Sequence, residues 1–215
     1  MTDTPRPDRR ARRRQETIEE ILDISVDVMT EDGVNGLTLA EVARRLGVQT
    51  PSLYKYFPSL AAIYDALFRR GMEEHLLVQQ EAMASAKPGL PALTAGLEAS
   101  GRWALEHQAL AQLMFWRPLP RFEPTADAMA PSEQMVALQK QAIRDAVALG
   151  QLGKDALDDG AYIASILIKG VMTQAMANEP DLPWGEGRFS PTFPRLMGML
   201  PALYPPAPVA RTRRR

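Results

Sequence analysis

Apolar residues recur every three to four positions along most of the chain, which predicts helices. The first such segment covers about residues 15–32. A later one, about residues 60–85, follows Ser59, a good N-terminal cap, and is broken by the Lys-Pro-Gly sequence at 87–89. No alternation typical of strands competes, so we expect an all-α fold. The buried face of the first helix should consist of Ile18, Ile21, Leu22, Ser25, Val28 and Met29.

The chain beyond residue 89 continues the helical pattern, interrupted by segments rich in Pro and Gly. Residues 90–116 are typical of one long or two short helices. The remaining expected elements are a loop over 117–131, helices over about 132–150 and 155–178, a loop over 179–191, and a helix over about 192–203 that Pro194 and Pro201 interrupt or bend.

Two short helices joined by a tight corner are predicted between residues 38 and 60. Thr38 can cap the first of them, and Glu41 three residues later completes a capping box. Gly47 stands where a left-handed residue ends a helix, and Thr50 is the next expected cap. Two helices across such a corner form a helix-turn-helix, whose second helix reads the DNA major groove.

The second of these helices divides into an inward and an outward face. Pro51 fits its first position, and Leu53 and Phe57, four residues apart, can both face the core. The outward set is then polar and aromatic, which suits insertion into a groove of DNA. It consists of Thr50, Ser52, Lys55 and Tyr56, with Tyr54 flanking.

Residues 15–72 resemble the DNA-binding domain of the TetR family of transcriptional regulators. The resemblance rests on ILDISVDVMTEDGVNGLTLAEVARRLGV followed by TPSLYKYFPSLAAIYDAL. It implies an N-terminal three-helix helix-turn-helix domain joined to a C-terminal helical bundle for ligand binding and dimerisation. The expected parts are a disordered basic arm (1–14), the DNA-binding domain (15–72, with a linking helix to about 85), a regulatory domain (90–204) and a disordered basic tail (205–215).

The resemblance also implies which residues contact DNA. Thr50, Pro51, Ser52 and Lys55 are placed to read base edges, and Thr38, Tyr54 and Tyr56 to meet phosphates. Members of the family commonly have Lys at the second residue of the fourth helix, where it holds a phosphate, but this chain has Leu60.

Charge along the chain suggests what compensates for that difference. The formal net charge is only −1, yet residues 1–14 hold six Arg against two Asp. A local basic patch attracts DNA whatever the total charge. We therefore expect Arg12, Arg13 and Arg14 to contact DNA. For Arg44 and Arg45 two interpretations stay open, namely phosphate contacts and a solvated helix face.

The composition argues against several other functions. Without cysteine there are no disulfides or thiolate chemistry, which fits a reducing cytoplasm, and two histidines are too few for a His-built metal centre. No apolar run is long enough to span a membrane, and no catalytic or nucleotide-binding motif is present. We expect neither an enzyme nor a bound cofactor or metal.

The C-terminal two-thirds are rich in Met and aromatic residues, which usually fill a helical core. The family resemblance instead implies a pocket for a small apolar or aromatic effector. The expected lining residues are Trp103, His107, Leu110, Met114, Phe115, Tyr162, Ile166 and Met172.

Residues 155–178 are apolar on more than one face, so a second subunit is the economical cover for one of them. The leading hypothesis is a cytoplasmic homodimeric repressor that a small hydrophobic effector releases from a near-palindromic operator in double-stranded DNA. The alternative is an effector-independent dimeric regulator whose bundle serves only dimerisation or a protein partner.

Overall fold

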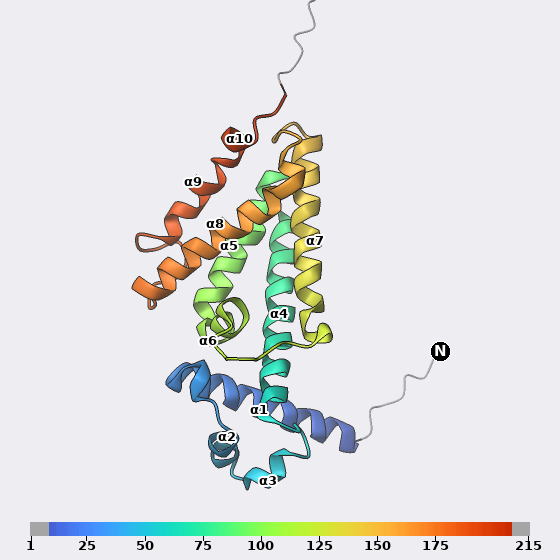
Figure 1. Ribbon diagram of the computed structural model, residues 1–215, viewed down its shortest axis with the longest axis vertical. Helices are drawn as coiled ribbons and strands as arrows, with labels where there is room; N and C mark the ends of the chain where they lie inside the picture. Colours follow the sequence, from blue (N-terminus) through green and yellow to red (C-terminus); the bar gives the residue numbers. More distant parts are fainter. Residues whose placement is uncertain (1–8, 208–215) are drawn as a thin grey trace, which may run out of the picture. The chain divides into compact units, whose positions relative to one another are not determined.

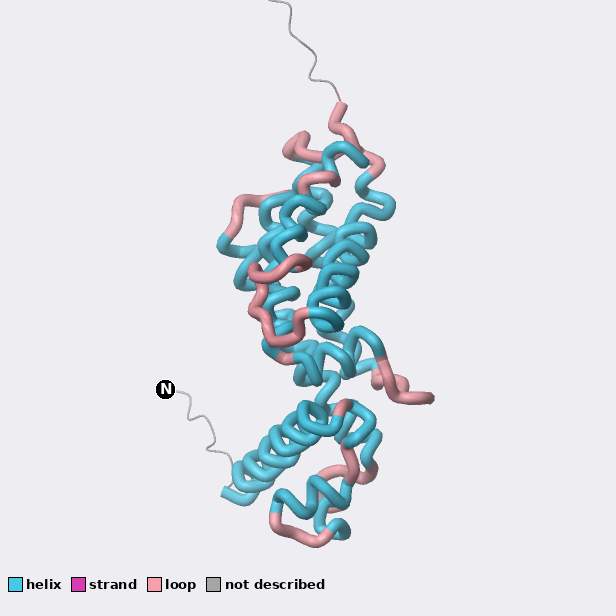
Figure 2. Tube along the Cα trace, turned by 90° about the vertical axis from the view of Figure 1, so that its left-hand side faces the viewer, coloured by secondary structure: helices cyan, strands magenta, loops and turns pink. Residues whose placement is uncertain are grey.

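The computed structural model describes residues 9–207, and every regular element in this part of the chain is a helix (Figures 1 and 2). The predicted all-α fold is confirmed. None of the described helices is long and apolar enough to cross a membrane. The elements are α1 Arg9–Asp32, η1 Val34–Gly36, α2 Leu39–Leu46, α3 Thr50–Leu53, α4 Leu60–Ser85, α5 Leu90–Glu106, α6 Gln108–Ala111, η2 Gln112–Trp116, α7 Ala126–Ala148, α8 Ala156–Asn178, η3 Ser190–Thr192, α9 Phe193–Met197 and α10 Leu200–Leu203.

Packing divides the described residues into two units. The N-terminal unit contains residues 9–71 and 108–129, and the C-terminal unit contains residues 72–107 and 130–207. The chain was expected to divide once, near residues 87–89. The segment 108–129 belongs to the N-terminal unit instead, because α6 packs against α1.

The N-terminal unit has a core of large apolar side chains from α1 to α4. Ile21, Val42, Leu53 and Phe68 are among its fully or almost fully buried residues. The expected inner face of α1 is buried as predicted, except that Ile18 is only half-buried. This core holds the short helices α2 and α3, which have too few residues to be stable alone.

Residues 117–125, called the strap below, pack on the first half of α4 within the N-terminal unit. The ring of Phe122 lies 5.9 Å from that of Tyr64 and 6.3 Å from that of Phe68. The Thr125 amide and hydroxyl both donate to the Asp65 carboxylate, at 2.7 and 2.9 Å. The strap therefore fastens the base of α4 although about 60 residues separate the two in sequence.

Two expectations about helix boundaries were wrong. α1 begins at Arg9, so residues 9–14 are helical and not a flexible arm; residues 1–8, like 208–215 of the expected tail, lie outside the described residues. α7 begins at Ala126 and includes Pro131, which was assigned to a loop. The Thr125 hydroxyl accepts from the Ala128 amide (3.3 Å) and caps α7. This cap was not predicted, because the prolines around it indicated a loop.

The C-terminal unit packs α5 against α8, and α9 against both. The Trp184 ring lies directly against Gly101 of α5, where a methyl group would have no room. At the end of the described chain the Tyr204 hydroxyl donates to the Asp159 carboxylate (2.5 Å) and the Gly153 amide donates to the Tyr204 carbonyl (2.9 Å). These bonds fix α10 next to the start of α8. The predicted interruption of the last helix is also present, as α9 and α10 are separate.

A cluster of neutral polar side chains is buried inside this otherwise apolar unit. His75 Nε2 lies 2.5 Å from Ser100 Oγ, and Gln139 Nε2 donates to Gln79 Oε1 at 3.2 Å. His75, Gln79 and Ser100 are each at most 4% exposed. Burial, and secondly the positive charge of Lys169, lowers the pKa of His75 to about 4. The cluster joins α4, α5 and α7 without placing a charge in the core.

Candidate nucleic-acid interface

Local sequence signals set the geometry of α2 and the corner after it. The Thr38 hydroxyl accepts from the Glu41 amide (3.2 Å), as predicted for the N-terminal cap. Gly47 adopts φ 74°, and its amide donates back to the Arg44 carbonyl (3.2 Å). Only a residue without a Cβ enters this left-handed conformation without strain. The corner that turns the chain toward α3 is therefore specified by one glycine.

The helix α3 is shorter than expected and begins differently. Gln49, not Thr50, is the capping residue, and no side-chain hydrogen bond caps this end. Thr50 is already the first helical residue, so the prediction that it caps α3 was wrong. α3 ends at Leu53, and the Tyr56 amide donates to the Leu53 carbonyl (2.9 Å) in a tight turn. Lys55 and Tyr56 thus lie on this turn.

The predicted inward face is observed, and the predicted outward face is observed in part. Leu53 is fully buried and Phe57 is 7% exposed, so both anchor the segment in the core. Pro51, Tyr54 and Lys55 are exposed; Thr50, Ser52 and Tyr56 are half-buried. The segment therefore offers a proline, hydroxyls and an ammonium group to a partner.

The side chains of Arg44 and Arg45 form a network with two carboxylates. Arg44 donates to Glu41 through Nε (2.8 Å) and Nη2 (2.6 Å). Arg45 donates to Glu41 through Nε (2.7 Å) and to both oxygens of Glu31 through Nη1 (2.9 Å) and Nη2 (2.8 Å). The hydrogen bonds from Arg44 and then Arg45 lower the pKa of Glu41 to about 2. Two positive and two negative charges cancel here, and for Arg45 the contacts favour a structural role.

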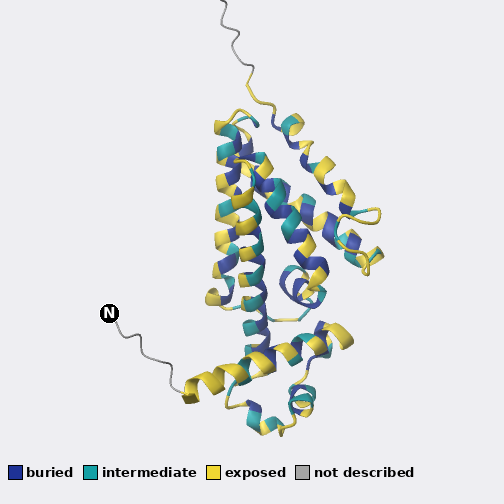
Figure 3. Ribbon diagram, turned by 180° about the vertical axis from the view of Figure 1, so that it is seen from behind, coloured by how far each residue is buried: buried dark blue, intermediate teal, exposed yellow. Residues whose placement is uncertain are grey.

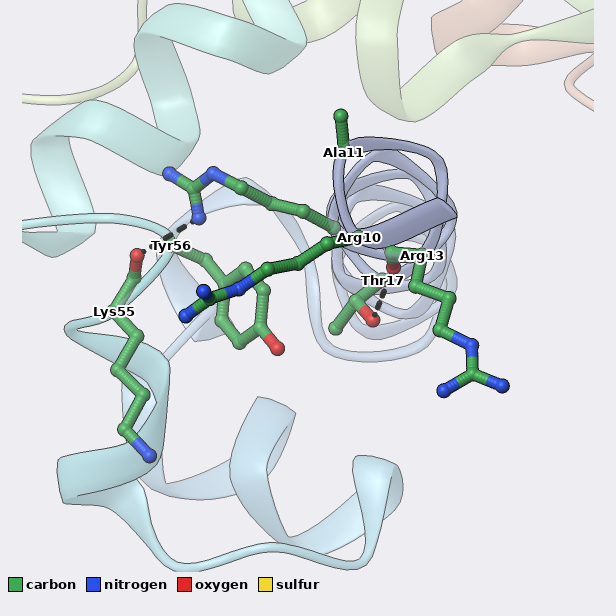
Figure 4. A pocket seen from close by; sticks show the side chains of 7 residues that line it. Arg10, Ala11, Arg13, Thr17, Lys55 and Tyr56 are labelled. Carbon is green, nitrogen blue, oxygen red and sulfur yellow. Dashed lines mark hydrogen bonds between the residues drawn. The ribbon is translucent and has the colours of Figure 1, made fainter. Parts of the chain in front are cut away.

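The first turns of α1 lie beside the turn that follows α3. Arg14 Nη1 donates to the Lys55 carbonyl (2.9 Å), and its guanidinium carbon lies 5.4 Å from the centre of the Tyr56 ring. An open pocket of about 520 Å³ lies between the two segments (Figure 4). It is lined by Arg10, Ala11, Arg13, Arg14, Thr17, Lys55 and Tyr56.

Arg10 and Thr17 of this pocket were not predicted as site residues. Together with Arg13 and Arg14 they recur at three- and four-residue spacing, which places them on one face of a helix. The apolar pattern predicted the first helix only from about residue 15, so this face was missed. Arg12, which was predicted, is not among the lining residues; it pairs with Glu16 at 3.4 Å.

The family profile described as "Bacterial regulatory proteins, tetR family" matches residues 21–67. This range contains α2, the corner and α3 together with the core that holds them. The helix-turn-helix domain of the chain belongs to the TetR family.

Two curated relatives extend the comparison. The tetracycline repressor protein class A from transposon 1721 of Escherichia coli is 40% identical over 55 residues, 26% of either chain. The HTH-type transcriptional repressor DrrR1 of Streptomyces coeruleorubidus is 30% identical over 123 residues, 55% of this chain and 43% of DrrR1. The chain therefore spans about a quarter of the length of the tetracycline repressor that it matches.

The TetR-like fold continues beyond this domain. The crystal structure of the transcriptional regulator FadR from Bacillus subtilis in complex with stearoyl-CoA superposes with a TM-score of 0.68 at 16% identity, over 85% of this chain and 96% of that one. At this identity the likeness establishes the fold.

Leu60 stands where the family resemblance led us to expect a phosphate-binding Lys. It is half-buried at the start of α4 and lines an open hollow of about 600 Å³ between α4 and the strap. Phe122 and Leu119 are other apolar residues of this hollow. Leu60 therefore contributes apolar surface where a relative would place an ammonium group.

The structure places the expected effector-binding residues of the chain in different surroundings. Leu110 and Met114 are buried and Phe115 is half-buried in the N-terminal unit, whereas Trp103 and Met172 are buried in the C-terminal unit. The other three, His107, Tyr162 and Ile166, are exposed on the C-terminal unit, so they do not line its interior. The His107 ring stacks on that of Trp103 with the two ring centres 4.9 Å apart, and Tyr162 and Ile166 are 52% and 63% exposed.

Proposed function

We propose that the chain is a sequence-specific DNA-binding regulator of transcription in the cytoplasm, and that it acts as a repressor. The observation that carries this proposal is the α2–α3 pair, held by a buried face and presenting Pro51, Tyr54 and Lys55 outward. It lies within the range that matches the TetR-family profile. A rigid pair of this kind inserts its second helix into the major groove.

The chemistry of the outward residues suits some of them to base edges and others to phosphates. Ser52 and Lys55 offer a hydroxyl and an ammonium group that can hydrogen-bond base edges, and Pro51 offers an apolar surface to a thymine methyl. The hydroxyls of Thr38, Tyr54 and Tyr56 suit phosphate oxygens, which fix position without selecting sequence. We expect specificity to rest mainly on Pro51, Ser52 and Lys55.

We also propose that the regulator is a homodimer. One helix as short as α3 meets few base pairs, whereas a two-fold dimer reads two half-sites and so selects near-palindromes. Exposed positions recur along the helices of the C-terminal unit (Figure 3). Apolar residues among those on α8 support the proposal, since Leu157 is 50%, Tyr162 52% and Ile166 63% exposed. Met199 and Leu203, at 63 and 59%, add to the exposed apolar surface of the same unit. Such residues gather where a second chain covers them.

The proposed effector is a small apolar or aromatic molecule. The buried Trp103 and Met172 supply adaptable apolar surface in the C-terminal unit. A protein of the same fold, FadR from Bacillus subtilis, has been solved with stearoyl-CoA, whose acyl chain is of this kind. Effector binding would release DNA by favouring a conformation in which the two α3 helices no longer match the half-site spacing.

The primary test is selection of binding sites from a randomised duplex pool, followed by titration of the selected site. We expect a near-palindromic consensus for the unaltered protein. Lys55→Ala should weaken binding to the selected site by ~1–3 kcal/mol and relax base preference at one position of each half-site. Lys154→Ala removes an exposed Lys from the C-terminal unit and serves as the charge control. Equal losses on all sequences would remove Lys55 from the base-reading residues.

The effector is tested separately with stearoyl-CoA and with smaller aromatic compounds. A compound that binds the protein should weaken binding to the selected site when it saturates the protein. If bound compounds leave DNA affinity unchanged, the second candidate is favoured, in which the bundle serves only dimerisation or a protein partner.

A further inference from the structure

The Arg-rich start of α1 is an ordered part of the surface next to α3. Its hydrogen bond from Arg14 to the Lys55 carbonyl joins residues 41 apart in the sequence. The same guanidinium covers the Tyr56 ring, so one side chain fixes both residues of the turn. Arg14 therefore holds the pocket together, and its donors are partly used within the protein.

The other pocket residues leave a basic surface facing solvent. In Figure 4 the side chain of Arg10 runs across the Tyr56 ring toward the side on which Lys55 lies, and that of Arg13 points to the other side. Within residues 9–207 no hydrogen bond or ion pair occupies the Arg13 guanidinium or the Lys55 ammonium group. No carboxylate lines the pocket. The pocket therefore attracts an anion.

We propose that this pocket binds a phosphate of the DNA backbone, with Arg10 and Arg13 on α1 and Lys55 after α3 as its cationic donors. This inference rests on the proposed function. It gives the chain a phosphate anchor at the N-terminus of α1 in place of the one that Leu60 cannot supply at α4. Arg14 is a positioning residue in this site, because it acts through Lys55 and Tyr56.

The geometry suits a backbone phosphodiester. The open pocket of about 520 Å³ admits a phosphate together with the chain that continues from it on both sides. Arginine forks bind phosphate oxygens through paired donors, which a fixed helix can aim in advance. Lys55 belongs both to the pocket and to the predicted base-reading set, so a phosphate bound here is next to the bases being read.

The chain contains a matched control for this site. Lys154 carries the same charge as Arg13, but it is exposed on the C-terminal unit and lies outside the pocket. Replacing either residue by Ala changes the net charge equally. Only the Arg13 substitution removes a donor from the pocket.

The experiment measures binding of the full chain to a fluorescein-labelled duplex of about 24 bp and arbitrary sequence, from 50 to 300 mM KCl, by fluorescence anisotropy. Loss of one phosphate contact lowers the salt slope by about 0.9. For each bound subunit we therefore expect Arg13→Ala to reduce this slope by about one and the affinity by roughly 5- to 10-fold near 0.1 M salt. Lys154→Ala should change the affinity less than about twofold.

The outcomes separate this inference from the proposed function. Equal slopes for the Lys154→Ala and Arg13→Ala variants, with DNA still bound, would overturn the pocket alone. Absence of DNA binding by the unaltered protein, on arbitrary and selected sequences, would overturn the proposed function and the pocket with it. Circular dichroism of each variant confirms that α1 remains helical.

Arg14→Lys tests the positioning role. This substitution keeps the charge but loses the fork that reaches the Lys55 carbonyl. We expect the salt slope to be unchanged, while the preference for the selected site over arbitrary sequence falls. A slope reduced as much as in the Arg13→Ala variant would show that Arg14 itself binds phosphate, which would overturn its assignment as a positioning residue.

Discussion

Acidification from pH 7 to pH 4 should destabilise the folded chain through one residue, His75. This imidazole is 4% exposed, lies 2.5 Å from the Ser100 hydroxyl and stands 5.2 Å from the Trp103 ring. Its surroundings hold it neutral, because burial, assisted by the charge of Lys169, lowers the pKa of His75 to about 4. In the unfolded chain the same group returns to its ordinary pKa near 6.5.

The sign and size of the effect follow from these two pKa values. Between pH 6.5 and about 4 the unfolded chain binds a proton at His75 that the folded chain does not bind. The stabilising contribution is complete above pH 6.5 and is lost as the pH falls to about 4. The difference between the two pKa values corresponds to ~3 kcal/mol, a large part of the stability of an ordinary domain.

The assay is urea unfolding followed by circular dichroism at fixed protein concentration, at several pH values between 7.5 and 3.5. Three proteins are compared: the unaltered chain, His75→Gln, and His107→Gln, which replaces the other histidine of the sequence at an exposed position. Carboxylates titrate alike in all three and cancel. The loss of unfolding free energy from pH 6.5 to 4 should be smaller in the His75→Gln protein by up to ~3 kcal/mol.

The comparison does not depend on the absolute stability of His75→Gln, since only the change with pH is used. Parallel pH curves for the unaltered and His75→Gln proteins would refute the reasoning. A flattened curve for His107→Gln alone would refute it as well, because the acid-sensitive group would then lie on the surface.

A glycine, a carboxylate and an exposed isoleucine give three further tests. Gly101→Ala places a methyl group against the Trp184 ring, so it should lower stability by ~1–3 kcal/mol and shift the tryptophan emission, with a smaller effect in a Trp184→Leu background. Glu41→Gln removes a carboxylate whose pKa is lowered to about 2, so its ionised form stabilises the fold above pH 4.5 and this contribution is lost as the pH falls to about 2. The variant should therefore lose less stability than the unaltered protein between pH 4.5 and 2, as followed by circular dichroism. Ile166→Glu should convert the proposed dimer to a monomer in sedimentation experiments, whereas Leu149→Glu, at a similarly exposed residue, should leave it intact.

Sequence signals that act over a few residues predicted the α2–α3 pair well. The cap at Thr38, the left-handed turn at Gly47 and the buried anchors Leu53 and Phe57 are all observed. Ser59 also caps α4 as expected, since its hydroxyl accepts from the Ala62 amide (3.2 Å). Each of these features depends on neighbours within one or two helical turns, so periodicity and residue type are enough to predict it.

Features that depend on distant residues were not predictable in this way. The start of α1 lies against Lys55 through Arg14, a contact across 41 residues, so composition alone indicated a disordered arm. The family resemblance placed Tyr162 and Ile166 among the expected effector contacts, and both are exposed in the structure. Apolar periodicity cannot tell a residue that faces its own core from one that faces outward. Nor could it place residues 108–129, whose packing on α1 assigns them to the N-terminal unit.

The strap also matters for recombination between relatives. A single crossover at the natural break near residues 87–89 would keep α1 to α4 but import a foreign strap, without the Thr125 hydrogen bonds to Asp65 or the ring of Phe122 on Tyr64. A chimera that keeps the N-terminal unit of this chain and takes the C-terminal unit of another therefore needs two exchanged segments, with residues 108–129 retained from this parent. A unit that is continuous in space need not be continuous in the gene, so exchange of the C-terminal unit requires changes on both sides of the strap.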